Sequence, residues 1–272
     1  MLITFVLLQI NKKYYTVSKT EGINMKESNK AQELLDIIQK SKHVAVLTGA
    51  GISTLSGIPD FRGVGGLYSR KDIDANKLFD IHYFRKDPSY YYKNTRNFLY
   101  EVAAKPNIVH ETLAKMEQKG LIKAVITQNI DLLHQKAGSK TVFELHGSPM
   151  KHYCLSCGKE FDFDTVLSMI QEKEVPYCPH CGGIIKPKIV FFGESLPEYD
   201  LDNAEYHARH ADFLLVLGTS LTVYPAAAIP EITHRAGGKL GIVNASPTYI
   251  DSVASYKAND LGEIFEKLNA LL

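Results

Sequence analysis

The chain has 272 residues, of which 45% are hydrophobic and 22% are charged, with 31 Lys and Arg against 30 Asp and Glu. Such a length and composition are typical of a globular protein with one large domain, alone or with a small attached one. The balanced charge excludes both an overall basic surface for nucleic acid and an acidic, disordered composition. For that reason we expect no direct nucleic-acid partner. No apolar run is long enough to span a bilayer, so we also expect no membrane partner.

Residues 1–27 are expected to form an N-terminal extension that is disordered or lies upstream of the true start. The first ten residues are mostly apolar, but no basic residue precedes them and no small-residue cleavage site follows. A signal peptide is therefore the weaker interpretation. Met25 opens a polar stretch that looks like a more natural start, and we expect a cytoplasmic protein.

The rest of the chain alternates helical and strand-like patterns. Apolar residues at helical spacing over residues 31–38 predict a helix; a second helix follows Pro106 and ends at Gly120, and a third closes the chain from Leu261. Residues 64–104 are expected to be irregular and partly helical. Short apolar runs, read as strands, occupy residues 44–47, 124–127, 142–145, 189–192, 213–217 and 240–243. This alternation predicts an α/β fold, a parallel sheet with helices on both faces, whose ligands bind beyond the carboxyl ends of the strands.

All four cysteines occur in two Cys-x-x-Cys pairs, Cys154 with Cys157 and Cys178 with Cys181, separated by twenty residues. This spacing is typical of a tetrahedral zinc site with four thiolate ligands, which leaves no position open for catalysis. A redox dithiol would need only one pair. A zinc ribbon that binds nucleic acid is disfavoured by the acidic residues between the pairs. We therefore predict one structural zinc per chain.

A glycine turn, Gly49-x-Gly51, follows the first apolar run and is typical of loops that bind the phosphates of a dinucleotide. The third glycine of the usual pattern is replaced by Thr54, and Pro59 prevents a regular helix from continuing. No acidic residue ends a second strand about twenty positions later, as a hydride-transferring dehydrogenase requires. The turn alone therefore indicates a dinucleotide and disfavours a dehydrogenase.

Longer motifs carry a resemblance to a known family. They are, in chain order, Gly49-Ala50-Gly51-Ile52-Ser53, Ser56-Gly57-Ile58-Pro59-Asp60-Phe61-Arg62-Gly63, Thr127-Gln128-Asn129-Ile130-Asp131 with His134, His146-Gly147, Phe192-Gly193-Glu194, Gly218-Thr219-Ser220-Leu221 and Val243-Asn244. Together with the cysteine pairs after His146, they resemble the sirtuin family of NAD-dependent protein deacetylases, closest to simple bacterial sirtuins. The resemblance covers about residues 30–272. One departure is Leu132, where the family commonly has glycine.

The resemblance implies a reaction in which acyl-lysine and NAD give free lysine, nicotinamide and O-acyl-ADP-ribose. It assigns catalysis to His146, as the general base, and to Asn129 and Asp131. It assigns the acyl-lysine channel to Phe192 and Gly193. For NAD binding it implies Gly49, Ala50, Gly51, Thr54, Asp60, Phe61, Arg62, Gln128, Ile130, Gly218, Thr219, Ser220, Asn244 and Leu261. Members of this family that favour acidic acyl groups carry a Tyr-x-x-Arg pair in the region after the cofactor segment, whose guanidinium binds the acyl carboxylate. Between Gly63 and Pro106 no tyrosine is followed three residues later by arginine, so the resemblance implies a preference for acyl groups without a carboxylate.

The resemblance also implies a domain organisation. A Rossmann-like NAD-binding domain is expected to comprise residues 28–63, 105–150 and 186–272. It is interrupted by a helical module or cofactor loop at 64–104 and by a zinc-ribbon module at 151–185, and these two modules are expected to form a small second domain. The expected partners are acetylated or otherwise acylated proteins and peptides, bound by a monomer. Two alternatives stay open: a mono-ADP-ribosyltransferase on the same fold, and an NAD-sensing protein without catalysis.

Overall fold

The computed structural model describes residues 20–60, 66, 72–96, 99 and 104–272. Its main sheet has six strands, and each neighbouring pair is parallel. Along the sheet the strands are β3 (Val142–Glu144), β2 (Ala124–Thr127), β1 (Val44–Thr48), β7 (Phe213–Leu217), β8 (Lys239–Val243) and β9 (Tyr256–Ala258). The predicted α/β fold with a parallel sheet is thereby confirmed.

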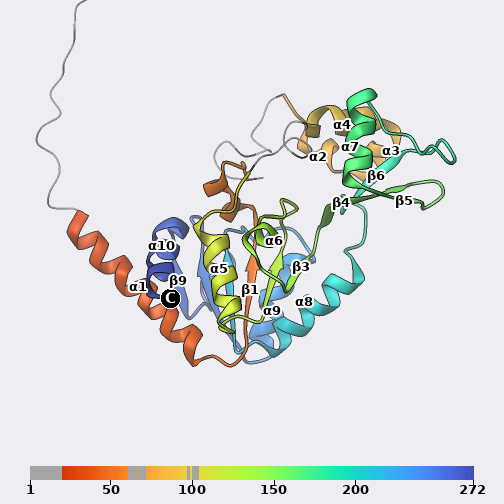
Figure 1. The fold of residues 1–272 in the computed structure, drawn as a ribbon. Coiled ribbons are helices and arrows are strands. Elements are labelled where there is room, and N and C mark those ends of the chain that lie inside the picture. The colour runs from red at the N-terminus through yellow and green to blue at the C-terminus, as the bar shows by residue number, and fades with distance from the viewer. Residues whose placement is uncertain (1–19, 61–65, 67–71, 97–98, 100–103) are drawn as a thin grey trace, which may run out of the picture.

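Helices cover both faces of this sheet (Figure 1). One face packs against α1 (Thr20–Lys40), α5 (Ile108–Gln118) and α10 (Leu261–Leu271). The other packs against α8 (Glu198–His210) and α9 (Ile229–Arg235), while α6 (Leu133–Ala137) lies beside α5. Because side chains alternate along a strand, Val46 of β1 faces the first helix layer and Leu47 faces the second. Both are fully buried, which explains why the central strands carry apolar residues on both faces.

The strand order reverses between β1 and β7. The chain runs outward from β1 to β2 and β3, and then returns to β7 on the other side of β1 before it continues to β8 and β9. In a doubly wound sheet, the two loops that leave such neighbouring strands diverge and open a crevice at their carboxyl ends. Here these loops begin at Gly49, which opens the short 3-10 helix η1 (Ala50–Ser56), and at Gly218.

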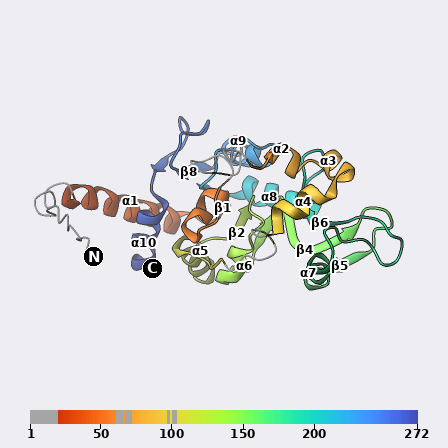
Figure 2. The same cartoon turned by 90° about the horizontal axis from the view of Figure 1, so that it is seen from above.

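A second, antiparallel sheet lies at one end of the molecule (Figure 2), in the order β5 (Glu160–Asp162), β4 (Gly147–Cys154), β6 (Ile185–Ile189). It shares a hydrophobic core with α7 (Phe163–Glu172) and with α2 (Ala75–Leu78), α3 (Ile81–Lys86) and α4 (Pro88–Thr95). Strands β4 and β6 extend past the expected limits of the zinc-ribbon module, 151–185, on both sides. The division into domains itself stays a prediction.

Three elements differ from the sequence-based expectation. The run 189–192 is not a strand of the main sheet, because β6 ends at Ile189 in the small sheet and Phe192 only bridges to Asp80. Strand β9 (Tyr256–Ala258) was missed because Lys257 at its centre leaves no apolar run. Helix α1 begins at Thr20, inside the segment expected to be an extension, while residues 1–19 lie outside the described part. Within that part, none of the helices combines the length and apolar character needed to cross a bilayer.

Candidate active site

A cavity of about 780 Å³ opens at the carboxyl ends of β1 and β7, where the strand order reverses. Its size lies within the range of ligand pockets. Most residues that the sequence assigns to the site line it. They are Gly49, Ala50, Gly51, Thr54, Asp60, Gln128, Asn129, Ile130, His146, Phe192, Gly193, Gly218, Thr219, Ser220, Asn244 and Leu261. Asp131 does not line the cavity, and Phe61 and Arg62 lie outside the described residues.

The glycines of the first turn pack against the loop that follows β7. Gly49 N–H donates to the Leu217 carbonyl at 3.0 Å, and Gly51 N–H donates to the Gly218 carbonyl at 2.8 Å. A Cβ atom on Gly51 would lie 2.8 Å from the Cα atom of Gly218, which is closer than real Cβ contacts allow. At this point the missing side chains are therefore required by the contact between two backbone segments of the protein itself.

Polar side chains connect the floor of the cavity across β1. Gln128, which follows β2, donates from Nε2 to the Thr219 hydroxyl at 3.1 Å. The same hydroxyl oxygen accepts the Leu221 N–H at 3.2 Å, so Thr219 caps its own loop. Ser220 is exposed in the cavity, with its hydroxyl 3.0 Å from that of Thr222. This wall therefore presents hydroxyl groups that are suited to binding phosphates or ribose.

The far end of the cavity is formed by the loops that follow β8 and β9. Asn244 N–H donates to the Ala258 carbonyl at 3.1 Å, and its Nδ2 donates to the Ser246 carbonyl at 2.7 Å. Leu261 begins helix α10 and is half-buried, with Asp260 as the helix N-cap. Both residues, Asn244 and Leu261, line the cavity, as expected of two residues assigned to NAD binding.

Asn129 and Asp131 are linked through a residue that the sequence analysis did not assign, Ser53. The Ser53 hydroxyl donates to Asp131 Oδ2 at 2.6 Å and accepts from Asn129 Nδ2 at 3.2 Å. Asn129 Nδ2 also donates to the Gly49 carbonyl at 3.2 Å. Asp131 therefore lies behind the wall and fixes the position of Ser53. Ser53 belongs to the quoted motif, but only the fold brings it next to a carboxylate.

A buried polar chain continues from Asn129 into the protein. Thr127 Oγ1 accepts the Asn129 N–H at 3.0 Å and the Thr48 hydroxyl at 2.8 Å. Because the Thr48 hydrogen is used in that bond, His134 Nε2, 3.0 Å away, must be the donor to Thr48 Oγ1. Burial lowers the pKa of His134 to about 3, so the ring is neutral at physiological pH. Two members of this chain of hydrogen bonds, Thr127 and His134, belong to one motif of the sequence, but the sequence analysis did not assign them to the site.

His146 lies between β3 and β4, at the wall of the cavity. Its Nδ1 is 2.8 Å from the Gln128 carbonyl oxygen, which can only accept a hydrogen bond, so Nδ1 carries the hydrogen. Burial lowers the pKa of His146, and the bond to Gln128 opposes this effect. At neutral pH the ring is therefore uncharged, with its lone pair on Nε2. This tautomer can take up a proton.

Backbone geometry near these residues is unusual. Leu132 has φ of 63°, in the left-handed region that a leucine adopts only at a steric cost. This is the position where the sequence departs from the glycine common in the family. Leu132 directly follows Asp131, whose Oδ1 accepts the Leu133 N–H at 2.9 Å. The conformation that glycine would adopt freely is thus retained here, held by hydrogen bonds to the Asp131 side chain.

Phe192 and Gly193 form a turn at the mouth of the cavity. The Phe192 side chain is 46% exposed, although it is large and apolar. Its backbone is fixed on both sides, because Phe192 N–H donates to the Phe79 carbonyl at 2.7 Å and its carbonyl accepts the Ile81 N–H at 3.2 Å. Gly193 has φ of 92°, and a Cβ atom there would lie 3.0 Å from the Ile81 side chain.

The four cysteines converge at the other end of β4. Their Sγ atoms all lie within 4.8 Å of one another, with Cys154 to Cys181 at 3.4 Å and Cys157 to Cys178 at 3.8 Å. Four thiolates bound to zinc at about 2.3 Å would be about 3.8 Å apart at the corners of a tetrahedron. The donor set and its spacing therefore fit one zinc ion. The cysteines do not line the cavity, which agrees with a structural role.

The fold and the site together define a doubly wound dinucleotide-binding protein with a separate four-cysteine metal site. The sequence model of the Sir2 family matches residues 49–225, and the chain belongs to this family. An NAD-dependent protein deacetylase of Thermotoga maritima is 48% identical over 85% of this chain and 93% of that protein. An NAD-dependent protein deacylase of Archaeoglobus fulgidus is 43% identical over 86% of this chain and 92% of that protein.

Solved structures agree with these relatives. A Sir2 structure in complex with a p53 peptide and NAD superposes with a TM-score of 0.80 at 46% identity, over 89% of this chain and 97% of that one. A Sir2 structure bound to an acetylated peptide gives a TM-score of 0.80 at 44% identity, with the same coverage of both chains. The resemblance to sirtuins that the motifs indicated is thereby confirmed.

Proposed function

We propose that this protein removes acetyl and other uncharged acyl groups from protein lysines, with NAD as co-substrate. The products are free lysine, nicotinamide and O-acyl-ADP-ribose. The proposal is supported by relatives named NAD-dependent protein deacetylase and deacylase. It is also supported by the structures of similar chains with NAD and acetylated peptide. These names favour deacylation over a mono-ADP-ribosyltransferase.

The observation that carries the proposal is the tautomer of His146. A protein that only binds NAD, or only transfers its ADP-ribosyl group, does not have to deprotonate a ribose hydroxyl. Deacylation does need a base such as this neutral imidazole, because a ribose hydroxyl must lose its proton before its oxygen can attack the acyl carbon. The bond from Nδ1 to the Gln128 carbonyl fixes both the ring and the tautomer.

The cavity has the shape and the donors that NAD requires. Gly51 and Gly218, whose backbones are in close contact, both line it. In the proposal, the turn and the residues Thr219 and Ser220 hold phosphates and ribose, while Asn244 and Leu261 hold the adenosine. Asn129, supported by Asp131, shapes the pocket for the nicotinamide ribose. NAD supplies a glycosidic bond that can be broken to form the acyl-accepting ADP-ribose.

The zinc site would contribute structure alone. Cys154, Cys157, Cys178 and Cys181 would occupy all four positions around the ion, so none is left for water or substrate. The ion would join the end of β4 to the turn that precedes β6, and β6 leads directly to the Phe192 turn. The cytoplasmic location and the monomeric state stay predictions.

The deciding experiment is incubation of the purified protein with an acetyl-lysine peptide and NAD, followed by mass spectrometry. We expect a peptide lighter by one acetyl group together with O-acetyl-ADP-ribose. A peptide heavier by one ADP-ribosyl group would instead show the transferase, and unchanged NAD would show a binding protein. A succinyl-lysine peptide of the same sequence serves as control, and faster turnover of this peptide would contradict the preference for uncharged acyl groups.

A further inference from the structure

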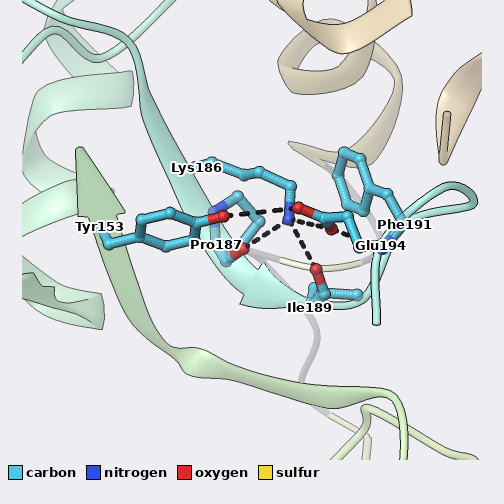
Figure 3. Close-up of polar contacts among 6 residues, drawn as sticks. All are labelled: Tyr153, Lys186, Pro187, Ile189, Phe191 and Glu194. Carbon is cyan, nitrogen blue, oxygen red and sulfur yellow. Dashed lines mark hydrogen bonds and ion pairs between the residues drawn. The ribbon is translucent and has the colours of Figure 1, made fainter. Parts of the chain in front are cut away.

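Lys186 is a fully buried lysine in β6, the strand that leads from the small sheet to the cavity. Its ammonium group donates to the Pro187 carbonyl at 3.1 Å and to the Ile189 carbonyl at 2.7 Å. The Glu194 carboxylate also lies within reach, with Oε2 2.9 Å from Lys186 Nζ (Figure 3). An ammonium group has three hydrogens, and these three acceptors use all of them.

Two aromatic rings complete the surroundings of this charge. The Phe191 ring centroid is 3.9 Å from Lys186 Nζ, and the Tyr153 centroid is 5.7 Å from it. The Tyr153 hydroxyl donates to Glu194 Oε1 at 3.4 Å, which places Tyr153 of β4 against the same ion pair (Figure 3). Contact with ring faces favours a cation in a site from which water is excluded. The Lys186 ammonium is therefore enclosed by β4 and β6 of the small sheet and by the segment that follows β6, while the Glu194 side chain stays 21% exposed.

Glu194 connects this charge to the turn that carries Phe192. Its Oε2 accepts the Phe191 N–H at 2.8 Å, and its own N–H donates to the Phe191 carbonyl at 3.0 Å. Residues 191–194 are thus closed into a tight turn by both the backbone and the side chain of Glu194. Phe192 and Gly193 lie at its tip, and the whole segment 189–194, Glu194 included, lines the cavity.

The same segment also contacts the proposed base. Val190 N–H donates to the His146 carbonyl at 2.9 Å, and Val190 directly follows Ile189, whose carbonyl accepts from Lys186. Lys186 therefore holds the start of the segment next to His146, and through Glu194 it holds the end next to Phe192. The remaining bonds of Phe192, to Phe79 and Ile81, are between backbone groups. The ion pair fixes the segment from the side of the small sheet.

We propose that Lys186 and Glu194 are positioning residues for the acyl-lysine substrate, and that their ion pair sets the distance between His146 and the Phe192 turn. The inference rests on the proposed function, because it concerns the channel for that substrate. Stability alone does not require a charge at this position, since buried ion pairs can often be replaced by apolar residues at no cost in stability. An exposed phenylalanine, in contrast, keeps a defined position only if its turn is held from behind.

The test uses the full chain with three variants: Lys186→Met, Glu194→Gln and the double variant. Steady-state rates are measured with the acetyl-lysine peptide varied at saturating NAD, and with NAD varied at saturating peptide. We expect each variant to raise KM for the peptide about tenfold or more, as the loss of a hydrogen bond to a charged group does, and to change KM for NAD by less than about threefold. Thermal unfolding is measured in parallel.

The double variant separates positioning from stability. Lys186→Met alone leaves a carboxylate without its cation, so it should unfold at a lower temperature, and the double variant should recover most of that loss. We expect KM for the peptide to stay high in the double variant. If KM recovers together with the unfolding temperature, or if KM for peptide and NAD rise equally, the pair has only a structural role and the inference fails.

Lys188 provides a matched control on the same strand. It pairs with Glu160, but both side chains are well exposed, so Lys188→Met should leave both KM values and the unfolding temperature unchanged. A peptide effect of equal size in Lys188→Met would also overturn the inference, because it would show a general effect of charge on peptide binding. If the wild-type protein does not turn over acetyl-peptide with NAD, the proposed function itself fails, and this inference with it.

Discussion

Replacing Ser53 with alanine tests whether Asn129 and Asp131 act as one unit. The substitution removes a single oxygen atom from a side chain that is 1% exposed in η1. The lost hydroxyl donates to Asp131 Oδ2 at 2.6 Å and accepts from Asn129 Nδ2 at 3.2 Å. Asn129 keeps its bond to the Gly49 carbonyl. Asp131 Oδ2, in contrast, loses the hydrogen bond from the Ser53 hydroxyl.

The size of the effect follows from the charge of the acceptor. A hydrogen bond to a charged group contributes about 1.5–3 kcal/mol, and a half-buried carboxylate recovers part of this from water. We therefore expect Ser53→Ala to lower the free energy of unfolding by about 1.5–2 kcal/mol. If Asn129 must be held to shape the ribose pocket, kcat/KM for NAD should fall by about tenfold or more, since about 1.4 kcal/mol corresponds to a factor of ten.

Urea unfolding gives the change in stability, and initial rates with NAD varied give kcat/KM. Ser89→Ala is the matched control, because the Ser89 hydroxyl donates to Asp87 Oδ1 at the same distance, 2.6 Å, at the start of α4 and away from the cavity. The control should lose some stability and no activity. A Ser53→Ala protein with the kcat/KM of the wild type would show that Asn129 does not depend on this hydroxyl.

Three further predictions concern the base, the metal and pH. His146→Ala should slow deacylation by about 10²–10⁴-fold, while exchange of labelled nicotinamide into NAD in the presence of acyl-peptide is better retained; equal loss of both would refute the assignment of a base. Elemental analysis should find one zinc per chain, and Cys154→Ala should lose the metal, unfold at a lower temperature and lose activity; full activity in this variant would contradict a structural zinc. Burial lowers the pKa of His110 to about 4 and that of His134 to about 3, so below pH 6.5 the unfolded chain binds protons that the folded chain does not. From these two groups the free energy of unfolding should fall between pH 6.5 and pH 4, by up to about 2.7 kcal/mol per pH unit, and urea midpoints that stay constant over this range would show that the two rings are not buried as neutral groups.

Much of the fold could be predicted because its central strands are apolar on both faces. Buried parallel strands leave continuous runs such as residues 44–47 and 213–217, which the sequence shows directly. The run at 189–192 is equally apolar, but its residues lie between the two sheets, where Val190 bonds to His146 and Phe192 bonds to Phe79. Hydrophobicity reports burial and not the sheet in which a residue is buried, so this run was assigned to the wrong place.

The site could be predicted as a set of residues, but the contacts within it could not. Motif positions such as Asn129 and His146 line the cavity. A motif identifies which chemical groups belong to a site, but it gives only their order along the chain. Ser53 and Asp131 meet across 78 positions of sequence, and Lys186 meets the Phe192 turn only through a side chain. Pairings of this kind depend on tertiary geometry, which spacing along one chain does not encode.

The glycine turn shows most clearly how a correct sequence signal can have a second cause. The sequence interprets Gly51 as room for a phosphate, whereas the structure places the Gly218 backbone where its side chain would be, with Cβ to Cα at 2.8 Å. Gly51→Ala should therefore separate the loops after β1 and β7, and lower stability by about 1–3 kcal/mol even without NAD, as overpacking does. Gly262→Ala is the control, because a Cβ atom there meets its nearest neighbour at an ordinary 3.4 Å within helix α10. If Gly51→Ala unfolds at the same urea concentration as the wild type and loses only affinity for NAD, then the phosphate is the sole reason for this glycine.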